Sequence, residues 1–134
     1  MAAKKQAKAK RGRPPAGKPG VTWATVRKLA LAFPGVTEGT SYGDPAFLLD
    51  GKFFSRFNPK EQALVVYAAE PLRDALLAGR PDVYFTTDHY RNYPYVLARL
   101  ERLPRAELAS LYAEAFRAKA KRKTLAAYEE RAPR

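Results

Sequence analysis

Apolar side chains recur with the helical period of 3.6 residues in two stretches of the chain, residues 22–33 and 104–123. The two stripes consist of Trp23, Val26, Ala30 and Phe33, and of Leu108, Leu111, Tyr112, Ala115 and Phe116. Thr22 suits the N-cap position of the first helix, because its hydroxyl can accept a hydrogen bond from the first turn. A shorter helix is predicted for residues 71–77.

Short apolar runs between turn residues predict five strands. These runs cover residues 46–49, 52–57, 63–67, 83–86 and 95–100. Asp50-Gly51 between the first two runs is a strong signal for a two-residue hairpin. Residues 58–61 contain Asn and Pro and predict the turn into the third strand. Residues 36–44 are rich in Gly and Thr, so we expect a loop there.

The predicted elements follow the order helix, three strands, helix, two strands, helix. Consecutive strands joined by hairpins form an antiparallel sheet, and amphipathic helices need an apolar surface to cover. The pattern therefore predicts a two-layer α+β domain, with a five-stranded antiparallel sheet and helices on one face. The last apolar stripe weakens after Phe116, so we expect the end of that helix to project beyond the core.

Lysine and arginine are concentrated in two places, and the formal net charge of the chain is +12. Residues 1–20 contain no acidic residue and hold Lys4, Lys5, Lys8, Lys10, Arg11, Arg13 and Lys18. The second cluster consists of Arg117, Lys119, Lys121, Arg122 and Lys123. Between residues 21 and 116, basic and acidic residues are equal in number. Clustered cations favour a polyanionic partner, because each neutralised phosphate releases condensed counterions.

Residues 2–20 lack large apolar side chains, so we expect residues 1–20 to form a disordered basic arm. Within this arm, Arg11-Gly12-Arg13-Pro14, preceded by Lys10, resembles the core of an AT-hook. In that motif the arginines follow the floor of a narrow minor groove, whose negative potential is strongest in A·T-rich tracts. A polycationic arm without groove preference is the alternative.

Several kinds of function have no support in the residues. The chain contains no cysteine, which excludes disulfides and thiolate catalysis. No run approaches the ~18 apolar residues of a membrane span, so no membrane partner is predicted. His89 has one carboxylate neighbour, Asp88, which is too few for a metal site, and we expect His89 and Tyr90 to pack a long loop. We predict no catalytic residue, no cofactor and no metal, and therefore a protein that is not an enzyme.

Five tyrosines lie in or beside the predicted loops. They are Tyr42, Tyr84, Tyr90, Tyr93 and Tyr95. Exposed aromatic rings can stack on unpaired bases or recognise a peptide. The other interpretation is that these rings cover the open edge of the sheet and fill corners of the core. The sequence leaves both interpretations open.

Several spaced motifs occur in a defined order along the chain. They are Phe33-Pro34-Gly35-Val36-Thr37-Glu38, Tyr42-Gly43-Asp44-Pro45-Ala46-Phe47, Gly51-Lys52-Phe53-Phe54, Phe85-Thr86-Thr87, His89-Tyr90, Tyr93-Pro94-Tyr95-Val96 with Leu100, and the segment 116–123. In this order the motifs resemble the MmcQ/YjbR family, over residues 23–123. The resemblance implies a YjbR-like fold, related to frataxin-like and secretion-chaperone-like architectures. It also implies a bacterial, cytoplasmic protein of a kind commonly described as DNA-binding.

Charge and resemblance together predict a small bacterial DNA-binding protein, cytoplasmic and associated with the nucleoid. Its domain is expected at residues 21–124, between the arm at 1–20 and a C-terminal tail at 125–134. The predicted DNA contacts are Lys10, Arg11, Gly12, Arg13, Pro14, Arg117, Lys119, Lys121, Arg122 and Lys123. The alternative is a protein- or peptide-interaction module whose basic ends only improve solubility. The preferred DNA sequence and the oligomeric state stay open.

Overall fold

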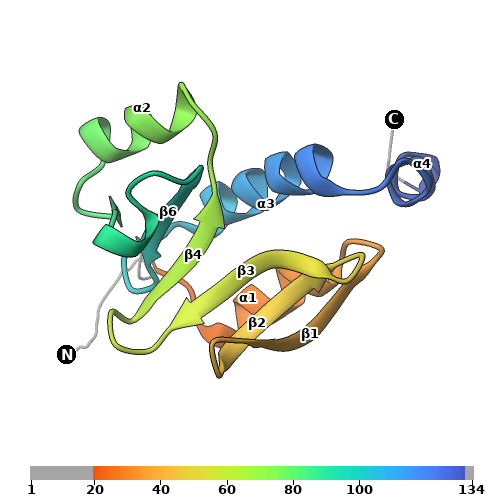
Figure 1. Cartoon of the computed structure of the whole chain (residues 1–134), viewed down its shortest axis with the longest axis horizontal. Helices are drawn as coiled ribbons and strands as arrows, with labels where there is room; N and C mark the ends of the chain where they lie inside the picture. Colours follow the sequence, from red (N-terminus) through yellow and green to blue (C-terminus); the bar gives the residue numbers. More distant parts are fainter. Residues whose placement is uncertain (1–19, 132–134) are drawn as a thin grey trace.

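The structure, a computed structural model, describes residues 20–131. Its elements in chain order are α1 (Trp23–Leu31), β1 (Val36–Ser41), β2 (Asp44–Leu49), β3 (Lys52–Asn58), β4 (Ala63–Tyr67), α2 (Leu72–Gly79), β5 (Tyr84–Phe85), the 3-10 helix η1 (Asp88–Tyr90), β6 (Tyr95–Arg99), α3 (Arg105–Lys119) and α4 (Arg122–Arg131). The strands of residues 20–131 form one six-stranded antiparallel sheet in the order β1-β2-β3-β4-β6-β5 (Figure 1). The predicted α+β class with an antiparallel sheet is confirmed.

The prediction of five strands was wrong, because residues 36–41 form strand β1 and not a loop. β1 pairs with β2 along its whole length, from Val36 opposite Leu49 to Ser41 opposite Asp44. Within β1 only Val36 is buried. An edge strand pairs on one side only and its other positions face solvent, so its sequence does not need the apolar alternation of an inner strand. The polar sequence of β1 therefore gave no strand signal.

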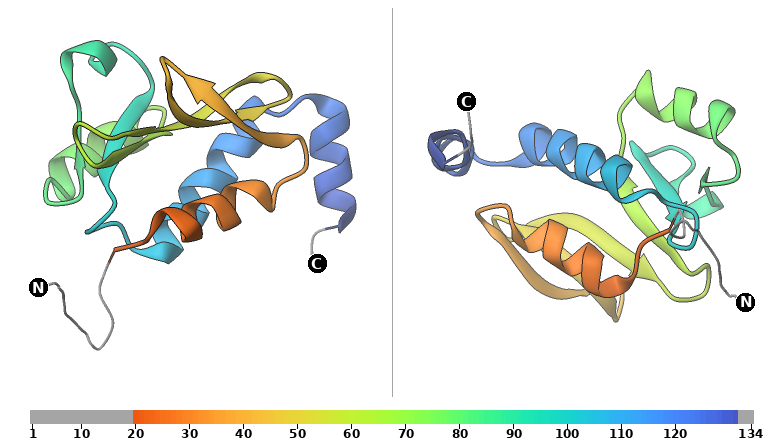
Figure 2. Two further views of the ribbon diagram at one scale, coloured as in Figure 1. Left: turned by 90° about the horizontal axis from the view of Figure 1, so that it is seen from below. Right: turned by 180° about the vertical axis from the view of Figure 1, so that it is seen from behind.

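The helices α1 and α3 lie side by side against one face of the sheet (Figure 2, left). The apolar stripes predicted for both helices point into this layer: Val26 and Ala30 of α1 are fully buried. The stripe of α3 is buried with them, through Leu108, Leu111, Tyr112, Ala115 and Phe116. The main core is thus the interface between the helices and the sheet, as the periodicity predicted.

The other face of the sheet carries a second, smaller apolar cluster. It consists of Ala63, Val65, Tyr90 and Leu97, with Phe53, Phe85 and Tyr95 packed against it. In β4, Leu64 and Val66 belong to the main core while Ala63 and Val65 belong to this second cluster. Successive residues of a strand point to opposite faces, so β4 is buried on both sides. Tyr90 is the contribution of η1, which covers this face.

A chain of buried hydroxyl groups fixes α3 on the sheet. The Tyr112 hydroxyl donates to Ser55 Oγ at 2.9 Å, and Ser55 Oγ donates to the carbonyl oxygen of Val65 at 2.7 Å. Burial raises the pKa of the Tyr112 hydroxyl, and the hydrogen bond to Ser55 offsets this only in part. The hydroxyl therefore stays protonated and acts as a donor, which anchors the middle of α3 to β3.

The end of the chain differs from the predicted single helix followed by a tail. α3 ends at Lys119, Ala120 is extended (φ −68°, ψ 144°), and α4 begins at Arg122. Tyr128 of α4 packs with Phe33 and Phe116, at ring-centroid distances of 5.5 and 4.9 Å. The part of the predicted tail at 125–131 is therefore helix, and Tyr128 attaches it to the main core.

Candidate nucleic-acid interface

The DNA contacts predicted from the sequence fall into two sets, and the structure describes only one of them. The arm residues Lys10, Arg11, Gly12, Arg13 and Pro14 lie outside the described residues. The other five lie where α3 ends and α4 begins. The chain changes direction there, and Figure 1 shows α4 beyond the end of α3, at one extreme of the molecule.

Four of these five cations form an exposed group that we call the basic corner. It consists of Arg117, Lys121, Arg122 and Lys123, all of which are exposed. None of the four forms an ion pair with any residue between 20 and 131. Cations without acidic partners keep their full charge available to a bound anion, which is the property that phosphate contacts need.

Lys119 lies apart from the basic corner. Its ammonium nitrogen is 5.0 Å from the ring centroid of Tyr67 and 5.2 Å from that of Tyr95. These distances are those of cation–π contacts, and the side chain is half-buried. The structure thus engages Lys119 with two tyrosines of the sheet, and we leave it out of the interface.

Asp50, in the turn between β2 and β3, holds the start of α4. The backbone N–H of Lys121 donates to Asp50 Oδ2 at 2.9 Å, and the Thr124 hydroxyl donates to Asp50 Oδ1 at 2.8 Å. The carboxylate therefore satisfies a backbone donor at the helix N-terminus, as a capping side chain does. The sequence predicted Asp50-Gly51 correctly as a hairpin turn, but no local pattern shows that Asp50 also caps a helix 71 positions later.

Gly35 makes this arrangement possible. Its backbone has φ +83°, and a Cβ at this position would lie 2.7 Å from Asp50 Oδ1 and 2.9 Å from Thr124 Cγ2. Its carbonyl oxygen accepts a hydrogen bond from the Asp50 N–H at 2.9 Å. The segment that links α1 to β1, the β2–β3 turn and α4 therefore meet at Gly35. This contact fixes the position of the basic corner relative to the rest of the domain.

A second group of polar and aromatic side chains lies at the other end of β2, around the buried Arg56. Arg56 Nη1 donates to Asp44 Oδ2 at 2.7 Å, and Nη2 donates to the Tyr90 hydroxyl at 3.1 Å. The rings of Tyr42 and His89 lie 5.6 Å apart, edge to face. Tyr90 is buried in the second cluster, as expected for a residue that packs the loop, whereas His89 is exposed. Sequence reasoning missed Arg56, because a basic residue inside a strand gives no sign that it is buried.

Arg73 of α2 fixes the loop that carries His89. Its guanidinium donates to the carbonyl oxygens of Tyr90 and Arg91, both at 3.2 Å, and to that of Tyr95 at 2.9 Å. Its side chain is only 11 % exposed. A single, largely buried cation thus satisfies several backbone acceptors of the segment after β5, so the position of η1 depends on α2.

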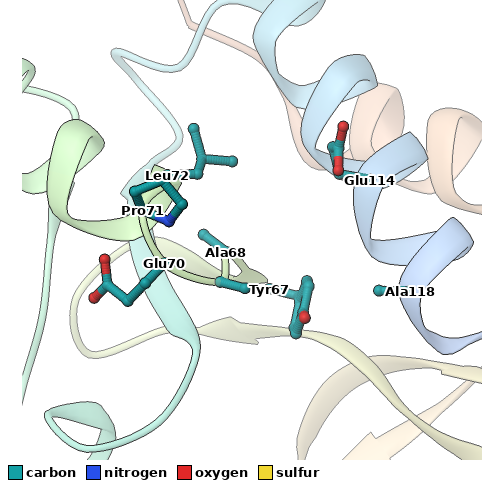
Figure 3. Close-up of a pocket in the computed structure, with 8 residues that line it drawn as sticks. Tyr67, Ala68, Glu70, Pro71, Leu72, Glu114 and Ala118 are labelled. Carbon is teal, nitrogen blue, oxygen red and sulfur yellow. The ribbon is translucent and has the colours of Figure 1, made fainter.

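A small cavity of about 250 Å³ opens between the start of α2 and α3 (Figure 3). Its apolar part includes Tyr67, Ala68 and Leu72, and the carboxylates of Glu70 and Glu114 lie at its sides. Glu70 already accepts a hydrogen bond from the backbone N–H of Asp74 at 3.0 Å. One of the two carboxylates at the cavity is therefore already engaged in holding the first turn of α2.

Between residues 20 and 131, no three His, Asp or Glu side chains come together in the way that a metal site requires. No helix within the same residues has both the length and the apolar character needed to cross a bilayer.

Comparison with known proteins relates this chain to one family. The family model described as YjbR matches residues 31–118. Two relatives named only as uncharacterised proteins, Rv2570 of Mycobacterium tuberculosis and Mb2600 of Mycobacterium bovis, are each 39 % identical to this chain over 59 residues. The aligned part is 44 % of this chain and 46 % of each relative, so the chain spans less than half the length of these curated relatives. No solved structure matches.

The matched region includes the whole group around Arg56 but only part of the basic corner. Tyr42, Arg56 and His89 lie inside residues 31–118, whereas Lys121, Arg122 and Lys123 follow it. The family match therefore contains the cluster around Arg56 and stops just before most of the basic corner.

Proposed function

This chain belongs to the YjbR family, and for this member we propose the function of a small protein that binds duplex DNA mainly through phosphate contacts. The observation that supports the proposal most is the basic corner, with its four exposed cations that have no acidic partner within residues 20–131. A formal net charge of +12 adds long-range attraction to a polyanion. The proposed location is the cytoplasm, in association with the nucleoid.

The arm adds a second proposed contact. Arg11 and Arg13, with Gly12 between them, would follow the minor groove and favour A·T-rich DNA. Phosphate contacts position a protein on DNA but do not read its sequence. The proposed protein therefore has high salt sensitivity and weak sequence preference, with no catalytic step and no cofactor.

Binding to duplex DNA is expected to weaken steeply as salt rises. The arm and the basic corner together hold 11 cations, Lys4, Lys5, Lys8, Lys10, Arg11, Arg13, Lys18, Arg117, Lys121, Arg122 and Lys123. If half of them contact phosphate, log K falls with log salt at a slope of about −5. Fluorescence anisotropy of a labelled duplex, titrated at several salt concentrations, measures this slope. A slope between zero and about −1 would reject the proposal and favour a protein- or peptide-interaction module.

Removing the Asp50 carboxylate is expected to weaken DNA binding, even though it removes a negative charge beside the basic corner. Asp50→Gly suits the backbone of this turn (φ 52°) but leaves the Lys121 N–H and the Thr124 hydroxyl without their acceptor. We expect a loss of about 1 kcal/mol in the free energy of unfolding. Duplex affinity should fall several-fold, because α4 no longer holds its cations in place.

Asp50→Asn is the matched control for this prediction. Asn also tolerates a positive φ, and its amide oxygen can accept from the Lys121 N–H while its NH2 group donates to the Thr124 hydroxyl. This variant therefore still holds the start of α4 with two hydrogen bonds, and it removes the charge. It should bind duplex DNA at least as tightly as the wild type, and the same anisotropy assay compares all three proteins. If Asp50→Gly bound more tightly than the wild type, charge alone would govern binding and the placement of α4 would not matter.

A further inference from the structure

Tyr42 occupies a position where neither the core nor the local backbone favours an aromatic residue. It is 77 % exposed, the most exposed large hydrophobic side chain of residues 20–131. Tyr42 and Gly43 form the two-residue turn between β1 and β2, and both have positive φ, 54° and 81°. Such turns favour Asn, Asp or Gly at the first position, where a larger side chain is strained. Strain of this kind is concentrated at functional sites.

The Tyr42 ring is nevertheless held in place. The guanidinium carbon of Arg56 lies 5.4 Å from its ring centroid, and the His89 ring meets it edge to face at 5.6 Å. Arg56 is itself fixed, because its side chain is 9 % exposed and is bonded to Asp44 and Tyr90. Three segments distant in the sequence, the β1–β2 turn, β3 and η1, thus orient one solvent-exposed ring. A ring oriented in advance loses little conformational entropy when it binds a ligand.

The chemistry of this arrangement selects a neutral, planar ligand. The cation of Arg56 already lies against the Tyr42 ring, so a second cation, such as a lysine or methylated lysine of a peptide, would meet its repulsion. A flat ring can stack on Tyr42 without that cost, and every nucleobase has such a face. Bases inside a duplex are covered on both faces by their neighbours. The ligand that fits is therefore an unpaired base.

We propose that Tyr42 is a stacking platform for an unpaired nucleobase, on a surface separate from the basic corner. The inference rests on the proposed function, since it assumes a nucleic-acid partner. Figure 1 shows β2 running from the Tyr42 turn toward the end of the molecule that carries α4. β2 has six residues, which corresponds to about 20 Å, or roughly six base steps of DNA. The DNA that reaches both surfaces is a duplex with a single-stranded end.

Tyr42→Asn tests this role, because Asn is a favoured residue in the turn but cannot stack as tyrosine does. Anisotropy is measured with oligo-dT, a blunt duplex, and the same duplex with a single-stranded dT end of ~6 nucleotides. We expect Tyr42→Asn to lose about tenfold in affinity for oligo-dT and for the overhang duplex, and nothing for the blunt duplex. The melting temperature should not fall, since the turn loses its strained residue.

Two variants control the experiment. Tyr42→Phe keeps the ring and should bind oligo-dT like the wild type. Tyr93→Asn removes another exposed tyrosine (58 % exposed) and should leave all three affinities unchanged.

The proposal is overturned if the wild type does not bind oligo-dT, or if Tyr42→Asn binds it equally well. It is also overturned if Tyr42→Asn lowers the melting temperature by more than about 4 °C, which would make the role structural. Weak, salt-insensitive binding of the blunt duplex by the wild type would instead contradict the proposed function, independently of the oligo-dT result.

Discussion

Replacing Asp44 with Ala is expected to destabilise the folded domain by about 2 kcal/mol, because it leaves a buried cation without its counter-ion. Asp44 and Arg56 form an ion pair at 2.7 Å, with side chains 27 % and 9 % exposed. Arg56 Nε already has no hydrogen-bond acceptor among residues 20–131. Loss of Asp44 would leave the Tyr90 hydroxyl as the remaining hydrogen-bond partner of the guanidinium. Urea denaturation measures the change in free energy, and the melting temperature should fall by about 8 °C.

Two further variants show whether burial is the cause. Glu38→Ala removes the partner of Arg27 in an ion pair of similar length, 2.6 Å, whose side chains are 44 % and 45 % exposed. Water can solvate that arginine once its partner is gone, so this variant should be nearly as stable as the wild type. The double variant Asp44→Ala with Arg56→Leu should recover much of the stability that Asp44→Ala loses, because no unpaired charge is left inside. Equal losses for Asp44→Ala and Glu38→Ala would contradict this explanation.

Replacing Arg117, Lys121 and Lys123 together with Gln is expected to lower duplex affinity about 100-fold at ~0.15 M salt. Each phosphate contact contributes about −0.9 to the slope of log K against log salt, so the loss of three contacts should make the slope less steep by almost 3. The side chains are exposed, and removing them should leave the melting temperature almost unchanged. A salt titration of the variant beside the wild type measures both the affinity and the slope.

The control for this variant changes the same number of charges elsewhere. Lys60, Arg102 and Arg105 are exposed and lie in the β3–β4 turn, after β6 and at the start of α3, away from the α3–α4 junction. Their replacement by Gln lowers the net charge equally, so it should weaken binding only through long-range attraction. If both triple variants lose the same affinity, the basic corner is not a specific contact surface. A collapse in stability of the first variant would show that its side chains support the junction itself.

Much of the fold could be predicted because buried positions recur in the sequence with the period of the helix or strand that carries them. The stripes of α1 and α3 face the sheet, and a helix that covers a sheet must repeat its apolar residues every three or four positions. The β2–β3 hairpin was predictable because Asp50-Gly51 is suited to positive φ at both turn positions.

The elements that were missed bury few side chains, so their sequences show no periodic apolar pattern. β1 is an edge strand that buries only Val36, so its sequence looks like a polar loop. α4 contributes Leu125 and Tyr128 to the main core, and two apolar residues in a polar helix are too few to show a period. The break between α3 and α4 lies at Ala120, a residue type that does not itself interrupt a helix.

The sequence by itself determined the type of most elements, the antiparallel α+β class and the clustering of basic residues near the end of α3, because these depend on local composition and spacing. The tertiary structure decided which of those residues form a surface. It turned Lys119 toward Tyr67 and Tyr95, and it left Lys121 and its neighbours exposed at a helix start capped by Asp50. It also brought Tyr42, Arg56 and His89 together. These contacts join residues far apart in the chain, and no local pattern encodes which distant side chain a residue will meet.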